Sequence, residues 1–168
     1  MTIKEGDTIP DAVFMELQDG KPTPVPSSDL FADRTVVLFA LPGAFTPTCS
    51  AKHVPGFVQN AEALKAKGVD EIACVSVNDA FVMGAWGKDQ GANGKVRMLA
   101  DGNGDFTRAV DLVMDGTKFG MGMRSQRYSM VVVDGKVTAL NVEQPGAFEV
   151  SSAEYLLNSG QLPSELPS

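Results

Sequence analysis

The chain has 168 residues, 43% of them apolar, which suits one domain with a single hydrophobic core. The 21 acidic and 14 basic residues give a formal net charge of −7, which argues against a surface for nucleic acid or anionic membranes, because phosphate binding requires a basic patch. Two cysteines do not make a disulfide scaffold, and residues 1–10 lack the apolar core of a signal peptide, so we expect a cytoplasmic protein.

The predicted elements alternate between strands and helices. Residues 36–41 form a continuous apolar run that stops at a Pro-Gly pair, which predicts a fully buried strand. A helix expected to end at Gly68 follows, and its apolar residues share one face: Val54, Phe57, Val58, Ala61 and Leu64. Two further strands are predicted at residues 71–77 and 96–100. Between them a short helix is marked by Phe81, Val82, Ala85 and Trp86.

The C-terminal part of the chain changes to an antiparallel pattern. Residues 129–133 and 136–140 are two apolar runs around an Asp-Gly turn, which predicts a hairpin. A final helix is predicted at residues 151–158, with either Ser151 or Ser152 as its N-cap.

This order of elements predicts an α/β fold with a central mixed β-sheet flanked by helices. A thioredoxin-like fold with an N-terminal extension is the best match. We expect residues 1–168 to form a single domain. Residues 21–26 are the most proline-dense stretch, and residues from about 160 to 168 are expected to form a loosely held tail.

The candidate chemistry lies where the strand at residues 36–41 meets the helix. Thr46 is a good N-cap and Pro47 suits the first helical position, so Cys49 falls in the first helical turn. Backbone N–H groups there lack helical partners and, with the positive end of the helix dipole, favour a thiolate, the form that reacts with peroxides and disulfides. Cys49 is therefore a candidate nucleophile. The structural alternatives are a small buried cysteine, an N-cap threonine and a core side chain at Phe45.

A thiolate that acts on a peroxide also needs a cation near the sulfur and the departing oxygen. Arg124 and Arg127 precede the strand predicted at residues 129–133. That strand should run antiparallel to residues 36–41, which would place its start beside Cys49. Arg127 is our first choice, and two solvated surface arginines are the alternative.

Three sequence blocks follow one another at ordered spacing. They are Pro-Gly-Ala-Phe-Thr-Pro-Thr-Cys at residues 42–49 with Lys-His-Val-Pro-Gly-Phe at 52–57, Val-Ser-Val-Asn-Asp at 75–79 with Phe-Val-Met at 81–83 and Trp86, and Arg-Ser-Gln-Arg-Tyr-Ser-Met at 124–130. Together they resemble the peroxiredoxins, in their Prx5 and plant type II branch. The agreement runs from about residue 6 to residue 157, nearly the whole chain.

The resemblance implies a thiol peroxidase without metal, haem or flavin, and a homodimer. Its thiolate would attack the terminal peroxide oxygen and become a sulfenic acid. Cys49 would be the nucleophile, Thr46 would donate its hydroxyl to the sulfur or the bound peroxide, Arg127 would supply positive charge, and Pro42 would shield and shape the pocket. Peroxide-binding roles are also implied for the backbone N–H groups of Gly43 and Cys49. Phe45 and Phe119 would form apolar walls that admit organic hydroperoxides as well as hydrogen peroxide.

The sequence leaves open how the sulfenic acid is reduced. Many members of this branch carry a resolving cysteine shortly after an Asn-Val-Glu segment, but residues 141–152 contain none. Cys74 matches a cysteine of plant type II members, yet it lies inside a predicted strand, and a disulfide needs Cα atoms within about 7 Å. We therefore favour an external thiol, either glutathione with glutaredoxin or thioredoxin, over Cys74 as the resolving group.

Other classes of function remain as alternatives. Cys49 and His53, the only histidine, stand four residues apart and could supply two metal ligands or a Cys-His hydrolytic dyad. A tetrahedral metal site wants three or four protein ligands, and no acid stands out to orient a dyad. In the family, His53 would pack or hydrogen-bond near the site. A third class is a non-enzymatic redox sensor that uses Cys49 only as a switch.

Overall fold

The structure is a computed structural model that describes residues 1–163. Its centre is a seven-stranded sheet in the order β2-β1-β5-β4-β3-β8-β9, and β6 pairs with β7 in a separate ribbon. The strands are β1 Val13–Gln18, β2 Lys21–Pro26, β3 Thr35–Ala40, β4 Glu71–Ser76, β5 Arg97–Ala100, β6 Val113–Asp115, β7 Met123–Ser125, β8 Tyr128–Val133 and β9 Lys136–Val142. The helices are α1 Ser27–Phe31, η1 Cys49–His53, α2 Val54–Gln59, α3 Ala61–Ala66, α4 Ala80–Asp89, α5 Asp105–Ala109, η2 Thr117–Phe119 and α6 Ala153–Asn158. Every helix in the described part of the chain is too short or too polar to span a bilayer.

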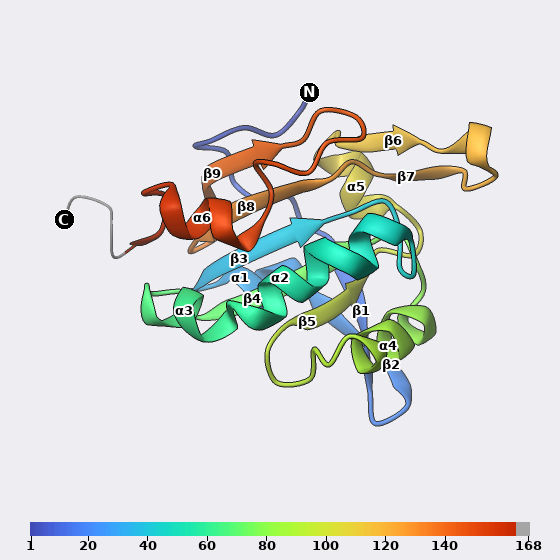
Figure 1. Cartoon of the computed structure of the whole chain (residues 1–168), viewed down its shortest axis with the longest axis horizontal. Helices are drawn as coiled ribbons and strands as arrows, with labels where there is room; N and C mark the ends of the chain where they lie inside the picture. The colour runs from blue at the N-terminus through green and yellow to red at the C-terminus, as the bar shows by residue number, and fades with distance from the viewer. Residues whose placement is uncertain (164–168) are drawn as a thin grey trace.

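Helices cover both faces of the sheet, and the β6–β7 ribbon projects from one end (Figure 1). Buried side chains of α2, α3, α4 and α6 form one core, whereas those of α1 and α5 contribute to the other. Strand β3 serves both, because Val37 and Phe39 face the first core and Val36 and Leu38 face the second. Burial on both faces explains why this strand is apolar at nearly every position.

The strands at the centre of the sheet bring two distant segments together. β3 runs parallel to β4 and antiparallel to β8, with Ala40 opposite Tyr128. The end of β3 therefore lies beside the beginning of β8, as the sequence predicted. The chain leaves β3 toward Cys49 and enters β8 directly after Arg127. The pairing of β3 with β8 therefore places these two residues at the same end of the two strands.

The strands and helices predicted from the sequence are present, with shifts of a few residues at their ends. One helix differs in shape: the run expected to continue to Gly68 breaks at Asn60 into α2 and α3. The side-chain amide of Asn60 donates to the Gly56 carbonyl at 2.8 Å, which supports this break. At the last helix Ser152 is the N-cap, because its hydroxyl accepts a hydrogen bond from the Tyr155 N–H at 3.1 Å.

The proline-dense segment at residues 21–26 is strand β2, which was not predicted from the sequence. β2 is an edge strand that pairs only with β1. Its prolines stand at every second position, Pro22, Pro24 and Pro26. Alternate residues of an edge strand direct their backbone N–H away from the partner strand, so these prolines remove no ladder hydrogen bond.

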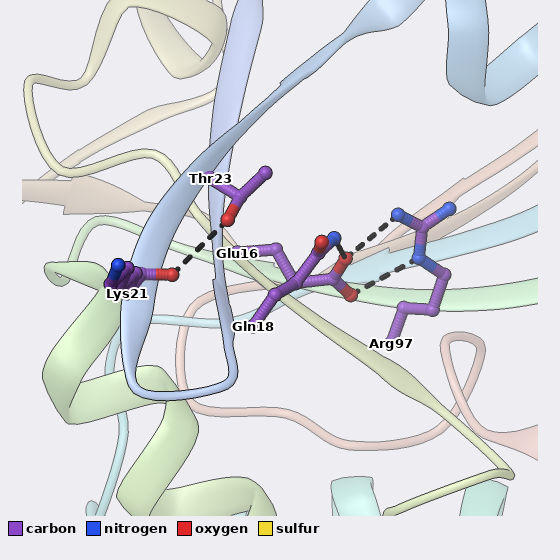
Figure 2. A network of polar contacts seen from close by, with 5 residues as sticks. All are labelled: Glu16, Gln18, Lys21, Thr23 and Arg97. Atoms are coloured by element: carbon purple, nitrogen blue, oxygen red, sulfur yellow. Dashed lines mark hydrogen bonds and ion pairs between the residues drawn. The ribbon is translucent and has the colours of Figure 1, made fainter.

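A polar network attaches this N-terminal hairpin to the rest of the sheet (Figure 2). Arg97 in β5 donates to the Glu16 carboxylate of β1 through Nη2 at 2.8 Å and through Nε at 3.1 Å. Gln18 donates to the same carboxylate at 2.8 Å, and the Thr23 hydroxyl donates to the Lys21 carbonyl inside the hairpin. The two hydrogen bonds between Arg97 and the Glu16 carboxylate supplement the short β1–β5 ladder, which has a single register pair.

The tail expected from about residue 160 is anchored where the structure describes it. Leu162 is fully buried, and Gln161 exchanges two side-chain hydrogen bonds with Asn141. The rest of the predicted tail, residues 164–168, lies outside the described residues.

Candidate active site

The site begins at the turn between β3 and the first long helix. The helical run starts at Pro47, passes through a five-residue π-helix over Cys49–His53, and continues as α2. The wider π turn is closed by the Val54 N–H, which donates to the Cys49 carbonyl. Single π turns inside α-helices are frequent at functional sites. Pro47 therefore occupies the first helical position, as predicted.

Thr46 precedes this helix, and its carbonyl accepts from the Ser50 N–H at 2.9 Å. Its hydroxyl donates to the Gly43 carbonyl at 2.7 Å, within the same turn. This bond differs from the donation implied by the resemblance, which was to the Cys49 sulfur or to a bound peroxide. In this state the hydroxyl closes the turn, and its oxygen lone pairs remain as acceptors.

Cys49 is completely buried, and its sulfur has a cationic donor. Arg127 Nη2 donates to Cys49 Sγ at 3.2 Å. The alternative of two solvated arginines is therefore wrong for Arg127. Arg124, in β7, donates to the Met121 carbonyl at 2.9 Å and to the Pro42 carbonyl at 3.4 Å. A guanidinium donor this close to sulfur favours the thiolate over the thiol.

His53 holds the other side of the same guanidinium. Arg127 Nη1 lies 2.8 Å from His53 Nδ1, and His53 Nε2 lies 3.0 Å from the Ser151 carbonyl oxygen. Arginine can only donate and a carbonyl can only accept, so Nδ1 must be the acceptor and Nε2 must carry the hydrogen. Burial, with a further contribution from the Arg127 charge, lowers the pKa of His53 to about 3. The imidazole is thus a neutral acceptor that fixes the guanidinium.

Aromatic rings enclose this pair. Phe39 stacks on Phe57 with ring centroids 4.0 Å apart, and the Phe39 ring lies 4.9 Å from the imidazole of His53. Phe148 meets His53 edge-on at 5.1 Å, and the Arg127 guanidinium carbon lies 5.9 Å from the centre of the Phe148 ring. The apolar enclosure limits the competition of water for these hydrogen bonds, which strengthens them.

A cavity of about 670 Å³ opens onto Arg127 and Pro42. Its walls are mostly apolar, and include Val113, Met114, Phe119, Pro145 and Ala147. Phe119 is among the residues that line this cavity, with 78% of its surface exposed. Phe45, the other wall that the resemblance implied, is absent from the cavity lining, is 55% exposed, and has its ring 6.3 Å from that of Trp86. The positive φ of Phe45, 63°, turns its side chain toward α4.

Two residues shape the turn that carries Thr46. Gly43 is buried, and a Cβ atom at this position would lie 2.8 Å from Arg124 Nη1. Asn78, in the second sequence block, accepts from the Ala44 N–H at 2.9 Å and also accepts from the Ser76 hydroxyl. The carboxyl end of β4 thus fixes the turn that follows β3.

Cys74 lies in the middle of β4, between Phe39 of β3 and Met98 of β5. It is completely buried, and burial raises the pKa of its thiol well above the ordinary value, with the nearby Cys49 adding to the rise. At neutral pH this thiol is protonated. It is therefore a weak nucleophile.

The sequence interpretation missed several contacts of this site. The sequence suggests His53 as a metal ligand, a dyad partner or a residue that packs or hydrogen-bonds near the site, but it does not identify Arg127 as the hydrogen-bond partner. In the structure the guanidinium lies in contact with both Cys49 Sγ and His53 Nδ1, an arrangement that neither a metal site nor a Cys-His dyad predicts. Within the described residues, no three metal-binding side chains gather at one place. Phe148 and Ser151 come from a loop about a hundred positions away from His53, with no local sequence signal to connect them.

Known proteins resemble this chain in both sequence and structure. Residues 4–157 match the Redoxin family model. Peroxiredoxin-2B of Arabidopsis thaliana is 50% identical over 159 residues, which cover 94% of this chain and 98% of the relative. The chloroplastic peroxiredoxin-2E of the same plant is 50% identical over 162 residues, covering 94% of this chain and 69% of the relative. A crystal structure of reduced Prx3 from Vibrio vulnificus in complex with hydrogen peroxide superposes with a TM-score of 0.89 at 54% identity, covering 93% of this chain and 98% of that one. The chain therefore belongs to the peroxiredoxins and is a thiol peroxidase with a thioredoxin-like fold.

Proposed function

We propose that Cys49 is the peroxidatic nucleophile of this thiol peroxidase and that it passes through a sulfenic acid. The observation that carries this proposal is the 3.2 Å contact between Arg127 Nη2 and Cys49 Sγ in a buried site. A fixed cation at this distance stabilises a thiolate. It can also stabilise the negative charge that develops on the departing oxygen, without reorganising during the reaction.

The reaction would proceed as a two-electron displacement. The Cys49 thiolate attacks the terminal oxygen of the peroxide, a sulfur–oxygen bond forms, and the oxygen–oxygen bond breaks. The sulfur is oxidised to a sulfenic acid, and the departing hydroxide or alkoxide takes up the proton that the thiol lost, giving water or an alcohol. Pro42 would shield this centre, and Arg127 would stabilise the negative charge on both peroxide oxygens.

The substrates proposed are hydrogen peroxide and organic hydroperoxides. The cavity in front of Arg127 is large enough for a small organic group, and its apolar lining suits an alkyl or aryl substituent. The related Vibrio vulnificus protein was crystallised in complex with hydrogen peroxide. That relative supports the smaller substrate, and the wall formed by Phe119 supports the larger ones.

We further propose that an external thiol reduces the sulfenic acid, either glutathione with glutaredoxin or thioredoxin. The first thiol would displace water to form a mixed disulfide with Cys49, and a second thiol would release the reduced enzyme. The burial and raised pKa of Cys74 support this choice over an internal disulfide. A homodimer and a cytoplasmic location stay predictions from the sequence.

The test is peroxide turnover by the purified protein with glutathione and glutaredoxin, and separately with thioredoxin. We expect turnover with at least one reductant and none in Cys49→Ser. A dimedone adduct on Cys49 after one equivalent of peroxide would identify the sulfenic acid. If Cys49 forms the adduct but neither system sustains turnover, the non-enzymatic sensor becomes the better interpretation of this thiol.

A further inference from the structure

Glu143 is a buried acidic residue that the chemistry described so far does not use. It follows β9, it is 7% exposed, and its backbone N–H donates to the Arg127 carbonyl at 3.0 Å. One of its two carboxylate oxygens, Oε2, accepts four hydrogen bonds between 2.7 and 2.8 Å. The donors are the backbone N–H groups of Glu149, Val150 and Ser151 and the Ser151 hydroxyl.

These bonds join the end of the loop between β9 and α6 to Glu143, which is the first residue of that loop. Ser151 is completely buried at the end of this loop, with both its backbone N–H and its hydroxyl bound to Glu143. A buried N–H needs a partner, and three consecutive N–H groups that share one anionic oxygen fix the local backbone strongly. The orientation of the Ser151 carbonyl is therefore set from the side of Glu143.

The Ser151 carbonyl is the group that accepts from His53 Nε2 at 3.0 Å. Without an acceptor there, the neutral imidazole could place its hydrogen on Nδ1 instead, and Nδ1 would then no longer accept from Arg127. The connection thus runs from the Glu143 carboxylate through the loop to the imidazole, and from the imidazole through the guanidinium to Cys49 Sγ. Each hydrogen bond along this connection is buried or half-buried.

We propose that Glu143 is a positioning residue for the peroxidase reaction. It would hold the loop so that His53 presents Nδ1 to Arg127, and Arg127 in turn points Nη2 at Cys49 Sγ. This inference rests on the proposed role of Cys49. What it adds to that role is a remote control of the site: an acidic side chain without contact to the sulfur sets the tautomer of His53 and the direction of the guanidinium.

The test compares three variants of the full-length protein. Glu143→Ala removes all four acceptor contacts, and Glu143→Gln keeps one oxygen in nearly the same place. Glu149→Gln removes the same charge from an exposed side chain of the same loop and serves as the matched control. Thermal unfolding of each variant reports whether it folds.

Three readouts would be measured. The first is the second-order rate constant of the reduced protein with hydrogen peroxide, followed by stopped flow. The second is the pH profile of iodoacetamide alkylation at Cys49, quantified by mass spectrometry. The third is the pair of imidazole nitrogen shifts in NMR, which is unambiguous because His53 is the only histidine.

We expect Glu143→Ala to slow the peroxide reaction by about 10- to 100-fold, because a misdirected donor near the reacting atoms loses rate on this scale. The midpoint of its alkylation profile should move to higher pH, and its NMR spectrum should show loss of the single Nε2–H tautomer. Glu143→Gln should recover part but not all of each effect, because a neutral amide oxygen accepts the loop N–H groups more weakly than a carboxylate. Glu149→Gln should match the wild type. A folded Glu143→Ala with wild-type rate, profile and tautomer would overturn the proposal.

If Glu143→Ala does not fold, the same readouts on Glu143→Gln decide, with wild-type values in all three again contradicting the proposal. Failure of the proposed function has a different signature. In that case the wild-type protein itself would show no reaction between Cys49 and peroxide, whereas the tautomer of His53 in the variants would still report on the connection from Glu143.

Discussion

His53 and Arg127 share a hydrogen bond of 2.8 Å in which the imidazole accepts and the guanidinium donates. A protonated imidazole could not make this bond, because it would have no lone pair at Nδ1 and would carry a charge beside another cation. The arrangement therefore requires a neutral histidine. The low pKa of His53, which results from burial and from the Arg127 charge, keeps the imidazole neutral at physiological pH.

The first prediction concerns stability at acidic pH. In the unfolded chain His53 takes up a proton near pH 6.5, whereas in the folded protein its pKa is about 3. The unfolded state thus binds more protons between these values, and the stability present above pH 6.5 is lost as the pH falls toward 3. We expect His53→Gln to lower the slope of unfolding free energy against pH by about 1 kcal/mol per unit in this window. Urea unfolding of both proteins at pH 7, 5 and 4 measures it, and equal slopes would contradict the assignment.

The second prediction separates the shape of the guanidinium from its charge. Arg127 contacts Cys49 Sγ through one terminal nitrogen and His53 Nδ1 through the other. A lysine at this position keeps the charge but cannot reproduce the two-pronged geometry. We expect Arg127→Lys to lower the rate constant with hydrogen peroxide by about 100-fold or more, the scale on which loss of an oriented donor acts. Arg108→Lys, in an exposed ion pair with Asp105, is the matched control and should stay within about twofold. Comparable losses in both variants would show that the effect is not specific to the site.

The sequence predicted the centre of the fold and the pairing of Cys49 with Arg127 for one physical reason. Residues 36–41 are apolar throughout because β3 is covered on both faces, so the strand was unmistakable. Once that strand was placed, an antiparallel hairpin beside it fixed which end of β8 lies near Cys49. The choice of Arg127 over Arg124 followed from its position directly before β8.

What the sequence could not predict depends on long-range contacts or on short elements. The edge strand β2 carries three prolines, which count against a strand everywhere except at an edge. The strands β6 and β7 have three residues each, too few for any periodicity. The bond between His53 and Ser151 joins residues 98 positions apart, and only the packed loop reveals it. Thr46 illustrates a local ambiguity, because its hydroxyl can close its own turn or approach the sulfur, and the residue type is the same in both cases.

A third prediction concerns the space at Gly43. A methyl group there would lie 2.8 Å from Arg124 Nη1 and 3.4 Å from Thr46 Cγ2, so the end of the arginine side chain must shift, and we expect its 3.4 Å contact with the Pro42 carbonyl to weaken. We expect Gly43→Ala to slow the peroxide reaction by about tenfold, because the turn beside Cys49 shifts with Arg124.

The control for this explanation is a double-mutant cycle between Gly43→Ala and Arg124→Ala. Removing the Arg124 side chain removes the clash, so the added cost of Gly43→Ala should be much smaller in that background. An unchanged cost would place the effect of the methyl group elsewhere, for example on Met121, whose terminal carbon lies 3.6 Å from the same position.

The last prediction addresses the second cysteine. Cys74 is completely buried in β4, a strand paired on both sides, with its pKa raised by burial. A disulfide with Cys49 needs Cα atoms within about 7 Å and a thiol that can react, and we expect that the buried, protonated Cys74 could form one only if the core around β4 opened locally. We expect Cys74→Ala to keep peroxide turnover with an external thiol within about twofold of the wild type, and to lose about 1 kcal/mol of stability from the small cavity that it leaves. Mass spectrometry after one equivalent of peroxide, without reductant, gives the independent check. A gain of one oxygen on Cys49 agrees with external reduction, whereas a loss of two hydrogens with a Cys49–Cys74 bridge, together with lost turnover in Cys74→Ala, would establish Cys74 as the resolving cysteine.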